Sequence, residues 1–301
     1  MTPRAVQIVE VGPRDGLQNE AVALSVAERL EFIALLEAAG ASRIEAVSFV
    51  NPARVPQMAG AEEIMAALPP TPGRSRIGLV LNLRGWERCV AAGCDEANVV
   101  VCATDAFGRR NQGADTAEQV AAMHAVAGRA RHEGPPVSAV ISVAFGCPFE
   151  GEVPLDRVVG IAHEIAAAGI TEIALADTIG VADPWTVRRR VEAVKAAAPD
   201  ARLRMHFHDT RRTALANAYA AVEAGADVLD ASCGGIGGCP FAPGATGNVA
   251  TEDLVFMLER AGVDTGLDLA RLIDAAHWIA GKLGKEVPGA VQRVGGFPRP
   301  Q

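Results

Sequence analysis

The chain has 301 residues, of which 50% are hydrophobic and 21% are charged. This composition is typical of a globular enzyme with a large core and excludes a disordered chain. The net charge of −8 argues against a general nucleic-acid or membrane-surface binder, because both need a basic face, but it leaves room for an anionic ligand in a local basic pocket.

Short runs of strand-forming residues alternate with stretches of helical periodicity along the whole chain. The runs that predict strands are Gln7–Val11, Arg43–Val50, Ile77–Asn82, Ala97–Ala103, Val137–Phe145, Glu172–Asp177, Leu203–His208 and Val228–Ser232. The stretches that predict helices include Val26–Ala39, Gln119–Arg131 and Pro184–Ala197. Ser25, with Glu28 three residues later, predicts a capping box at the start of the first of these helices.

A weak internal repeat supports this alternation. The predicted helices end in the pairs Ala39-Gly40, Ala92-Gly93, Ala168-Gly169 and Ala224-Gly225. Glycine favours helix C-termini because it adopts positive φ without a Cβ clash. Eight strand–helix units predict a (β/α)₈ TIM barrel, a fold of roughly 250 residues. The alternative, a doubly wound open sheet, would favour a G-x-G-x-x-G after the first strand, and that motif is absent.

We expect residues 1–265 to form the catalytic barrel and residues 266–301 to form a small helical extension packed on it, with a helix over Leu267–Leu283. No apolar run approaches the length of a membrane span, and the early apolar stretch Ala5–Val11 leaves no room for a signal peptide. The six cysteines contain no C-x-x-C pair and are expected to be free thiols in a reducing compartment. These observations predict a cytoplasmic protein.

In a barrel of this kind the active site lies at the C-terminal ends of the strands. The first strand ends in V-G-P-R-D-G, which places Arg14 and Asp15 there, although an ordinary turn with a surface ion pair would also explain this segment. The seventh ends in M-H-F-H-D-T, so His206 and His208 lie two apart and point to the same side. Two imidazoles on one face are half of a metal site. The histidines in helical stretches are expected to be ordinary core or surface residues: His124, His132, His163 and His277.

A glycine-rich segment, Ser232 to Asp253, follows the eighth strand. We expect the part from Gly234 to Gly247 to close over a substrate, since so many glycines make the backbone pliable. A flexible surface loop is the alternative. A cysteine between glycine and proline, Cys239, with Asn248 and Glu252 close behind it, favours a functional segment.

The donor types indicate which metal would bind. One carboxylate from Asp15, the imidazoles of His206 and His208 and an amide oxygen from Asn248 are too rich in oxygen for a structural zinc site and include no thiolate. They suit Mg²⁺ or Mn²⁺ with positions left for substrate oxygens. Such a cation lowers the pKa of a substrate hydroxyl, which a retro-aldol or retro-Claisen cleavage requires.

At these residues the sequence resembles the 3-hydroxy-3-methylglutaryl-CoA lyases, within a wider family of metal-dependent barrels that make or break carbon–carbon bonds beside an acyl-CoA. The R-D-G motif alone would place only the wider family, whereas G-G-C-P-F-A-P-G-A-T-G-N is far more specific to the lyases. The matching segments are Val9–Glu20, Ile44–Met58, Ala144–Gly151, Leu175–Val181, H-F-H-D-T and the Cys239 loop through Glu252-Asp253.

The resemblance implies cleavage of 3-hydroxy-3-methylglutaryl-CoA to acetyl-CoA and acetoacetate, with a divalent metal and no organic cofactor. It implies that Asp15, His206, His208 and Asn248 bind the metal. Arg14 would stabilise the enolate at the thioester carbonyl, and Cys239, a thiol with an ordinary pKa of about 8.5, would protonate that enolate. The general base is left open between Asp15 and His206.

Further site residues come from the same resemblance. The implied proton-relay or orienting residues are Glu45, Asp177 and Glu252, and the implied substrate-binding residues, besides Arg14, are Gln18, Ser48, Asn111 and Thr178. Arg211 is a further substrate-binding candidate although it departs from the family pattern, because it could receive a second carboxylate or a CoA phosphate; a position facing solvent is the alternative. The implied partner is the acyl-CoA substrate, with no nucleic acid or membrane involved. The resemblance also implies a homodimer and a place in leucine breakdown.

The sequence departs from the family pattern at Ala21, Thr104-Asp105 and Arg211-Arg212, where many members have Lys, Ser-Glu and a small glycine-containing pair. None of these removes a metal ligand or Cys239, but all lie where the acyl group or CoA could be contacted. The alternatives are therefore a related lyase for another 3-hydroxyglutaryl-CoA and a condensing synthase, which usually carries an added regulatory domain. A catalytically silent barrel that serves as a binding protein is a third.

Overall fold

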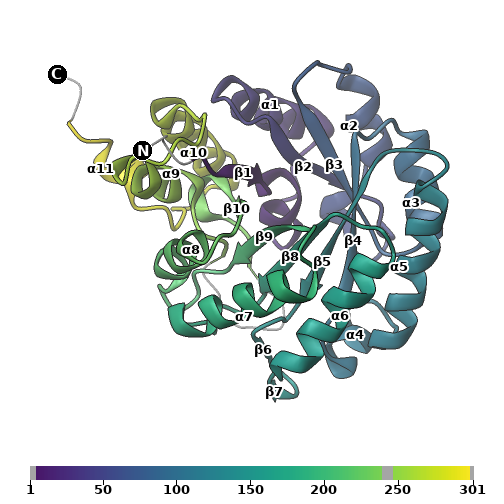
Figure 1. Ribbon diagram of the computed structural model, residues 1–301. Coiled ribbons are helices and arrows are strands. Elements are labelled where there is room, and N and C mark those ends of the chain that lie inside the picture. The colour runs from purple at the N-terminus through teal and green to yellow at the C-terminus, as the bar shows by residue number, and fades with distance from the viewer. Residues whose placement is uncertain (1–4, 239–246, 299–301) are drawn as a thin grey trace.

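The computed structural model describes residues 5–238 and 247–298. Eight parallel strands form a closed barrel in the order β1-β10-β9-β8-β5-β4-β3-β2, with helices around the outside (Figure 1). The strands are β1 (Gln7–Glu10), β2 (Arg43–Ser48), β3 (Ser75–Val80), β4 (Glu96–Cys102), β5 (Val137–Ser142), β8 (Glu172–Asp177), β9 (Arg202–Phe207) and β10 (Val228–Ala231). All eight predicted strands are present, so the (β/α)₈ prediction is confirmed and the open sheet is excluded.

Helices follow the strands as the sequence periodicity predicts. They are α1 (Val26–Ala38), α2 (Ala61–Ala67), α3 (Leu83–Ala91), α4 (Asp105–Asn111), α5 (Thr116–Ala130), α6 (Leu155–Ala167), α7 (Pro184–Ala197), α8 (Ala214–Glu223), α9 (Thr251–Arg260), α10 (Leu269–Leu283) and α11 (Val291–Val294). Shorter elements are the turns η1 (Gly12–Gly16), η2 (Pro56–Met58) and η3 (Cys233–Gly235) and the hairpin β6 (Gly146–Cys147)–β7 (Gly151–Glu152).

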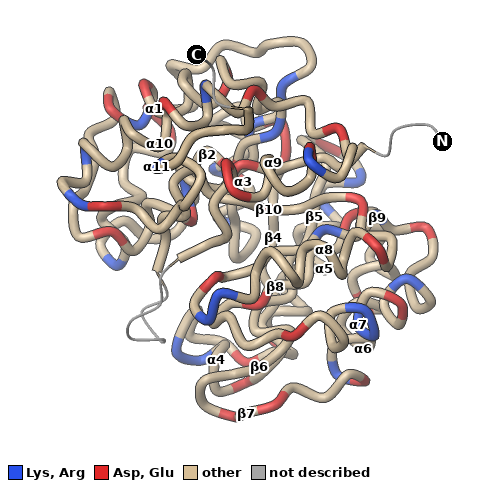
Figure 2. The backbone as a smooth tube through the Cα atoms, turned by 90° about the vertical axis from the view of Figure 1, so that its left-hand side faces the viewer, with Lys and Arg blue, Asp and Glu red and all other residues tan. Residues whose placement is uncertain are grey.

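Local sequence signals explain where these helices begin and end. The Ser25 side chain caps α1 and Glu28 completes the predicted capping box. The glycines that end the repeated units, Gly40 and Gly225 among them, have φ values of +97° and +98°, which a residue with a Cβ adopts only with strain. Basic and acidic residues are interspersed over the outer helices rather than gathered by sign (Figure 2). Among the described residues no helix has the length and apolar character to cross a membrane.

Buried charges close the floor of the barrel, where the strands begin. Arg43 at the start of β2 lies 2.6 Å from Glu96 of β4 and 2.7 Å from Glu172 of β8. Ser138 of β5 donates to Glu96 (2.7 Å), and Arg204 of β9 lies 3.4 Å from Glu172. Every carboxylate of this floor network therefore faces a cation or a hydroxyl, as buried charges require.

The C-terminal segment packs on one side of the barrel, next to α1 and α9 (Figure 1). Helix α10 contacts α1, α9 and η3, and the Trp278 ring stacks on Phe32 of α1 with centroids 5.7 Å apart. Asp268, the residue before α10, donates its N–H to the Ala39 carbonyl (2.8 Å). A boundary between barrel and extension at residues 265/266 stays our proposal.

Candidate active site

The turn η1, one turn of π-helix directly after β1, carries Arg14 and Asp15. Arg14 Nε donates to Glu45 Oε1 (2.9 Å), and Arg14 Nη1 donates to Asp15 Oδ1 (2.6 Å). Glycine is needed at Gly16, because a Cβ there would lie 2.7 Å from Ser232 Oγ in the segment after β10. The V-G-P-R-D-G motif thus lets the turn fit closely against the segment that follows the neighbouring strand β10, while one Asp15 oxygen is left for other partners.

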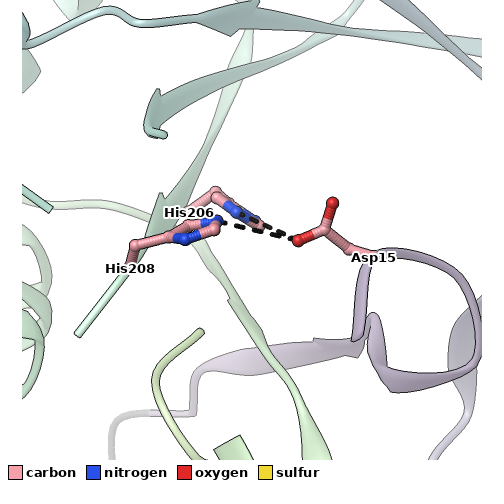
Figure 3. Close-up of side chains that lie close together, drawn as sticks. All are labelled: Asp15, His206 and His208. Carbon is pink, nitrogen blue, oxygen red and sulfur yellow. Dashed lines mark ion pairs between the residues drawn. The ribbon is translucent and has the colours of Figure 1, made fainter. Parts of the chain in front are cut away.

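Two imidazoles, His206 near the end of β9 and His208 directly after it, face that oxygen (Figure 3). Asp15 Oδ2 lies 3.8 Å from His206 Nε2 and 3.7 Å from His208 Nε2. The candidate ligand atoms of these three residues all lie within 4.8 Å of one another. The two-residue spacing at a strand end therefore places both rings on the same side, as the sequence predicts.

Asn248 completes this group from the far end of the glycine-rich segment. Its Nδ2 donates to Asp15 Oδ2 (2.9 Å) and to the Ile236 carbonyl (3.1 Å), and its main chain bridges to His208. Its Oδ1 is buried and has no hydrogen-bond partner among the described residues. An unsatisfied acceptor beside a carboxylate and two ring nitrogens fits a divalent cation that prefers oxygen and imidazole ligands.

The surrounding charges set the protonation of this cluster. Burial alone would raise the pKa of Asp15, but Arg14 and the two imidazoles hold that pKa well below its usual value. Burial would lower the pKa of His206, but its hydrogen bond to Asp230 and the charge of Asp15 raise it. Asp230 Oδ2 lies 3.1 Å from His206 Nδ1, so Nε2 is the ring nitrogen directed at Asp15.

A cavity of about 1100 Å³ opens beside the cluster. The predicted site residues that line it are Arg14, Asp15, Gln18, Glu45, Asn111, Thr178, His206 and His208. Besides Arg204 of β9, four arginines that sequence reasoning did not single out also line it: Arg54, Arg84, Arg88 and Arg110. Cation-rich walls of this kind suit an anionic ligand. Each of these four arginines lies in the loop after a barrel strand or in the helix that follows it. That position in the sequence could have indicated them, because barrel enzymes gather binding residues there.

Sequence and structural comparisons agree on the ancestry of this site. The HMGL-like family matches residues 5–279. The chain belongs to the HMGL-like family. It is 41% identical to the hydroxymethylglutaryl-CoA lyase of Bacillus subtilis, over 95% of this chain and 96% of that protein.

Two further relatives differ in the substrates they are named for. A 3-hydroxy-3-isohexenylglutaryl-CoA/hydroxymethylglutaryl-CoA lyase of Pseudomonas aeruginosa is 42% identical over 94% of each chain. An (R)-citramalyl-CoA lyase of Chloroflexus aurantiacus is 44% identical over 97% of this chain and 95% of that one. Among solved structures, an HMG-CoA lyase of Acinetobacter baumannii in complex with coenzyme A and 3-methylmalate superposes with a TM-score of 0.95, at 35% identity, over 100% of this chain and 98% of that one.

Some residues predicted for this HMGL-like site do not line its cavity. Asp177 is fully buried, accepts the N–H groups of Val181 and Ala182 (2.9 Å each), and has its pKa raised by that burial. The buried Ser48 hydroxyl has no hydrogen-bond partner among the described residues. Arg211 donates to two main-chain carbonyls of the loop after β8 (3.0 and 2.9 Å). Any role of these three residues in the reaction must therefore pass through neighbouring groups that do line the cavity.

Glu252 lies beneath η3, out of contact with the cavity. It accepts the Gly234 N–H (3.0 Å), and burial raises its pKa to about 8. Glu10 is a second buried acid there: it accepts from Gly12 N (2.8 Å), Cys233 N (2.9 Å) and Thr251 Oγ1 (2.7 Å), and burial raises its pKa to about 7. Glu10 joins η1 to η3, a role that sequence reasoning missed because Glu10 lies inside a predicted strand.

Cys239 and most of the predicted closing loop lie outside the described residues. The residues at either end of that gap can be placed. Gly238 lines the cavity and accepts a hydrogen bond from Asn19 Nδ2 (2.8 Å), and Gly247 accepts one from Asp209 N (2.8 Å).

The departures from the family pattern make contacts within the fold. Thr104 Oγ1 lies 3.1 Å from Cys147 Sγ, and Asp105 accepts the Thr116 N–H (3.1 Å). Arg212 pairs with Asp209 (3.1 Å). Ala21, where many members have lysine, is exposed.

Proposed function

We propose that this HMGL-like protein cleaves 3-hydroxy-3-methylglutaryl-CoA to acetyl-CoA and acetoacetate. The observation that carries the proposal is the group formed by Asp15, His206, His208 and Asn248 beside the buried Arg14, at the wall of a cavity large enough for an acyl-CoA arm. The names of the similar lyases from Bacillus subtilis and Pseudomonas aeruginosa support the substrate.

The four residues would hold Mg²⁺ or Mn²⁺. When bound, such a cation supplies positive charge that favours the ionised form of the substrate's tertiary hydroxyl. Asp15 suits this task because its depressed pKa keeps it anionic. Asp230 holds His206 with Nε2 directed into the site, as outer-sphere carboxylates do for ligating histidines.

The proposed reaction moves one proton out of the substrate and one back in. Asp15 or His206 takes the proton from the oxygen on C3, the C2–C3 bond breaks, and its electron pair passes into the thioester as an enolate. Arg14, held by Glu45, faces the oxygen on which that negative charge develops. The Cys239 thiol then donates a proton to C2, giving acetyl-CoA, while C3 becomes the ketone of acetoacetate. No oxidant or reductant takes part.

The remaining predicted residues would act around this centre. Gln18, Asn111 and Thr178 line the cavity and would contact substrate. Ser48, Asp177, Arg211 and Glu252 would hold the elements that carry the reacting groups. We also propose a homodimer that acts in leucine breakdown, as the resemblance implies, and a cytoplasmic location, as the sequence predicts.

The 44% identity to an (R)-citramalyl-CoA lyase favours one second candidate, cleavage of citramalyl-CoA. The two are separated by their products, since the same bond cleavage yields acetoacetate from one thioester and pyruvate from the other. Purified protein with Mg²⁺ should release acetoacetate from 3-hydroxy-3-methylglutaryl-CoA. Release of pyruvate from citramalyl-CoA with no acetoacetate from the first thioester would replace the proposed substrate with the second.

A further inference from the structure

The inner wall of the barrel is divided into two chemically different halves. Charged and imidazole side chains from η1, β9 and β10 face the cavity on one side. On the other side, β3, β4, β5 and β8 contribute an aliphatic cluster that is separate from the core under the helices. We call this cluster the aliphatic wall; its members are Leu79, Val100, Val140, Ala174 and Ala176, with Val50 and Leu81 packed against it.

The aliphatic wall starts beside the ligand cluster. Ala176 of β8 pairs in register with His206 of β9. Val140 pairs with Ala174, and Val100 pairs with Val140, so the wall continues strand by strand away from His206. All its members except Ala174 line the cavity.

The side chains of the aliphatic wall are smallest beside the ligand cluster, which leaves room there for a substrate group. The positions nearest the ligand cluster are alanines and the next are valines, while the larger Leu79 and Leu81 lie on the far strand, β3, or just after it. The polar neighbours that also line the cavity on these strands are Asn98 of β4 and Ser142 of β5. A group that extends from Ala176 along Val140, Val100 and Leu79 meets mainly aliphatic side chains, so burial there favours an apolar group.

We propose that the aliphatic wall receives the substituent on C3 of the substrate, and that the enzyme cleaves 3-hydroxy-3-alkylglutaryl-CoA thioesters whose C3 alkyl group is longer than methyl. The inference rests on the proposed function, because the reacting C3 must lie beside Asp15 and His206, and Ala176 is the neighbour of His206 on the next strand. The C2–C3 bond breaks as before, so the products are acetyl-CoA and a 3-oxo acid that keeps the alkyl group.

Burial of hydrocarbon supplies the physical reason. Each methylene that moves from water to such a wall favours binding by up to about fourfold. A methyl group covers little of a wall that extends over four strands, whereas a chain of four carbons reaches past Ala176 towards Val140. The Pseudomonas aeruginosa relative is named for a substrate with a 3-isohexenyl substituent, so a larger group on C3 has a precedent among the relatives' names.

The test compares thioesters with methyl, ethyl and butyl groups on C3, with acetyl-CoA release as the readout. For the native enzyme we expect kcat/KM for butyl to equal or exceed that for methyl. Val100→Phe, which fills the wall, should lower kcat/KM for butyl by about 100-fold relative to methyl, and the milder Val100→Leu should lower it less. Leu155→Phe, an exposed position on α6 outside the cavity lining, is the matched control and should change neither.

A binding measurement removes the dependence on turnover. The thioether analogues, in which CH₂ replaces the thioester carbonyl, cannot be cleaved. Calorimetry should show that native enzyme binds the butyl analogue at least as tightly as the methyl analogue, with the order reversed in Val100→Phe.

Three outcomes would overturn the inference. Cleavage of the methyl thioester with butyl about 100-fold or more poorer in native enzyme would reject the wall as the alkyl site and leave the proposed function intact. An equal loss for methyl and butyl in Val100→Phe would assign the wall to the pantetheine arm of CoA. Absence of acetyl-CoA from all thioesters would remove the proposed function as well.

Discussion

The floor and the mouth of this barrel both contain buried charges, but the floor carboxylates are closely paired, whereas the mouth keeps longer contacts and an amide oxygen without a partner. Arg43 binds Glu96 and Glu172 at 2.6 and 2.7 Å in the floor network. At the mouth, Asp15 lies 3.7–3.8 Å from two ring nitrogens, and the Asn248 Oδ1 beside it has no partner among the described residues.

This difference separates a structural role from a chemical one. Buried charges that are fully paired hold their elements in a fixed arrangement, and removal of one partner lowers the free energy of unfolding. Buried polar atoms without partners cost free energy in the folded state, so such groups commonly mark a place for a ligand. A substitution in the floor should therefore mainly lower the stability of the fold, and a substitution at the mouth should mainly lower activity.

The largest expected effect belongs to the floor. Arg43→Ala leaves two buried carboxylates without their cation and should lower the free energy of unfolding by about 3–5 kcal/mol. Chemical denaturation measures this, and Mn²⁺ affinity of the remaining folded protein should be unchanged. Weaker Mn²⁺ binding with unchanged stability would contradict the division between floor and mouth.

The converse change is at the mouth. Arg14→Gln removes the cation that we propose faces the developing enolate, so kcat should fall by about 10²–10³. The free energy of unfolding should change far less than in Arg43→Ala, and Mn²⁺ should still bind, because no ligand is lost. A variant that keeps native kcat would show that Arg14 does not stabilise the transition state.

Glu10, whose hydrogen bonds join η1 to η3 at the mouth, should make the free energy of unfolding depend on pH. Burial raises its pKa to about 7 in the folded state, above the usual value of about 4.3 in an unfolded chain. Between these values the folded protein holds a proton that the unfolded chain has released, so the free energy of unfolding falls as pH rises. The expected loss from pH 4.5 to 7 is about 3 kcal/mol.

Glu10→Gln carries no such proton and should flatten this part of the stability–pH curve. Denaturation of metal-free protein at several pH values measures it, with the exposed Glu63→Gln as a control that keeps the native slope. An unchanged slope in Glu10→Gln would mean that Glu10 is ionised in the folded protein.

The smallest effect concerns the positioning of a ligand. Asp230→Asn weakens the partner that orients His206 and should reduce Mn²⁺ affinity about 10–100-fold. Mn²⁺ titration followed by electron paramagnetic resonance measures this. Because the ligands themselves remain, saturating Mn²⁺ should restore most of the activity, and failure to restore it would assign Asp230 a part in the reaction itself.

Sequence reasoning reached the barrel because strand and helix periodicities differ and eight units recur. It reached His206 and His208 because two-residue spacing fixes a common side on one strand. Asn248 was singled out by its place behind Cys239 in the glycine-rich segment, but only the structure shows how that distant segment returns to His208. Asp230 and the aliphatic wall were missed because neighbours across the barrel depend on strand register, which a single sequence does not reveal.

Metal dependence is the central claim, and one titration tests it most directly. Chelator-treated enzyme receives increasing Mn²⁺ while bound Mn²⁺ and acetoacetate release from 3-hydroxy-3-methylglutaryl-CoA are recorded in the same samples. We predict no activity at the start and a rate that rises in proportion to bound Mn²⁺ up to one ion per chain. Full activity in chelator, with no bound ion, would contradict the assignment of Asp15, His206, His208 and Asn248 as a catalytic metal site.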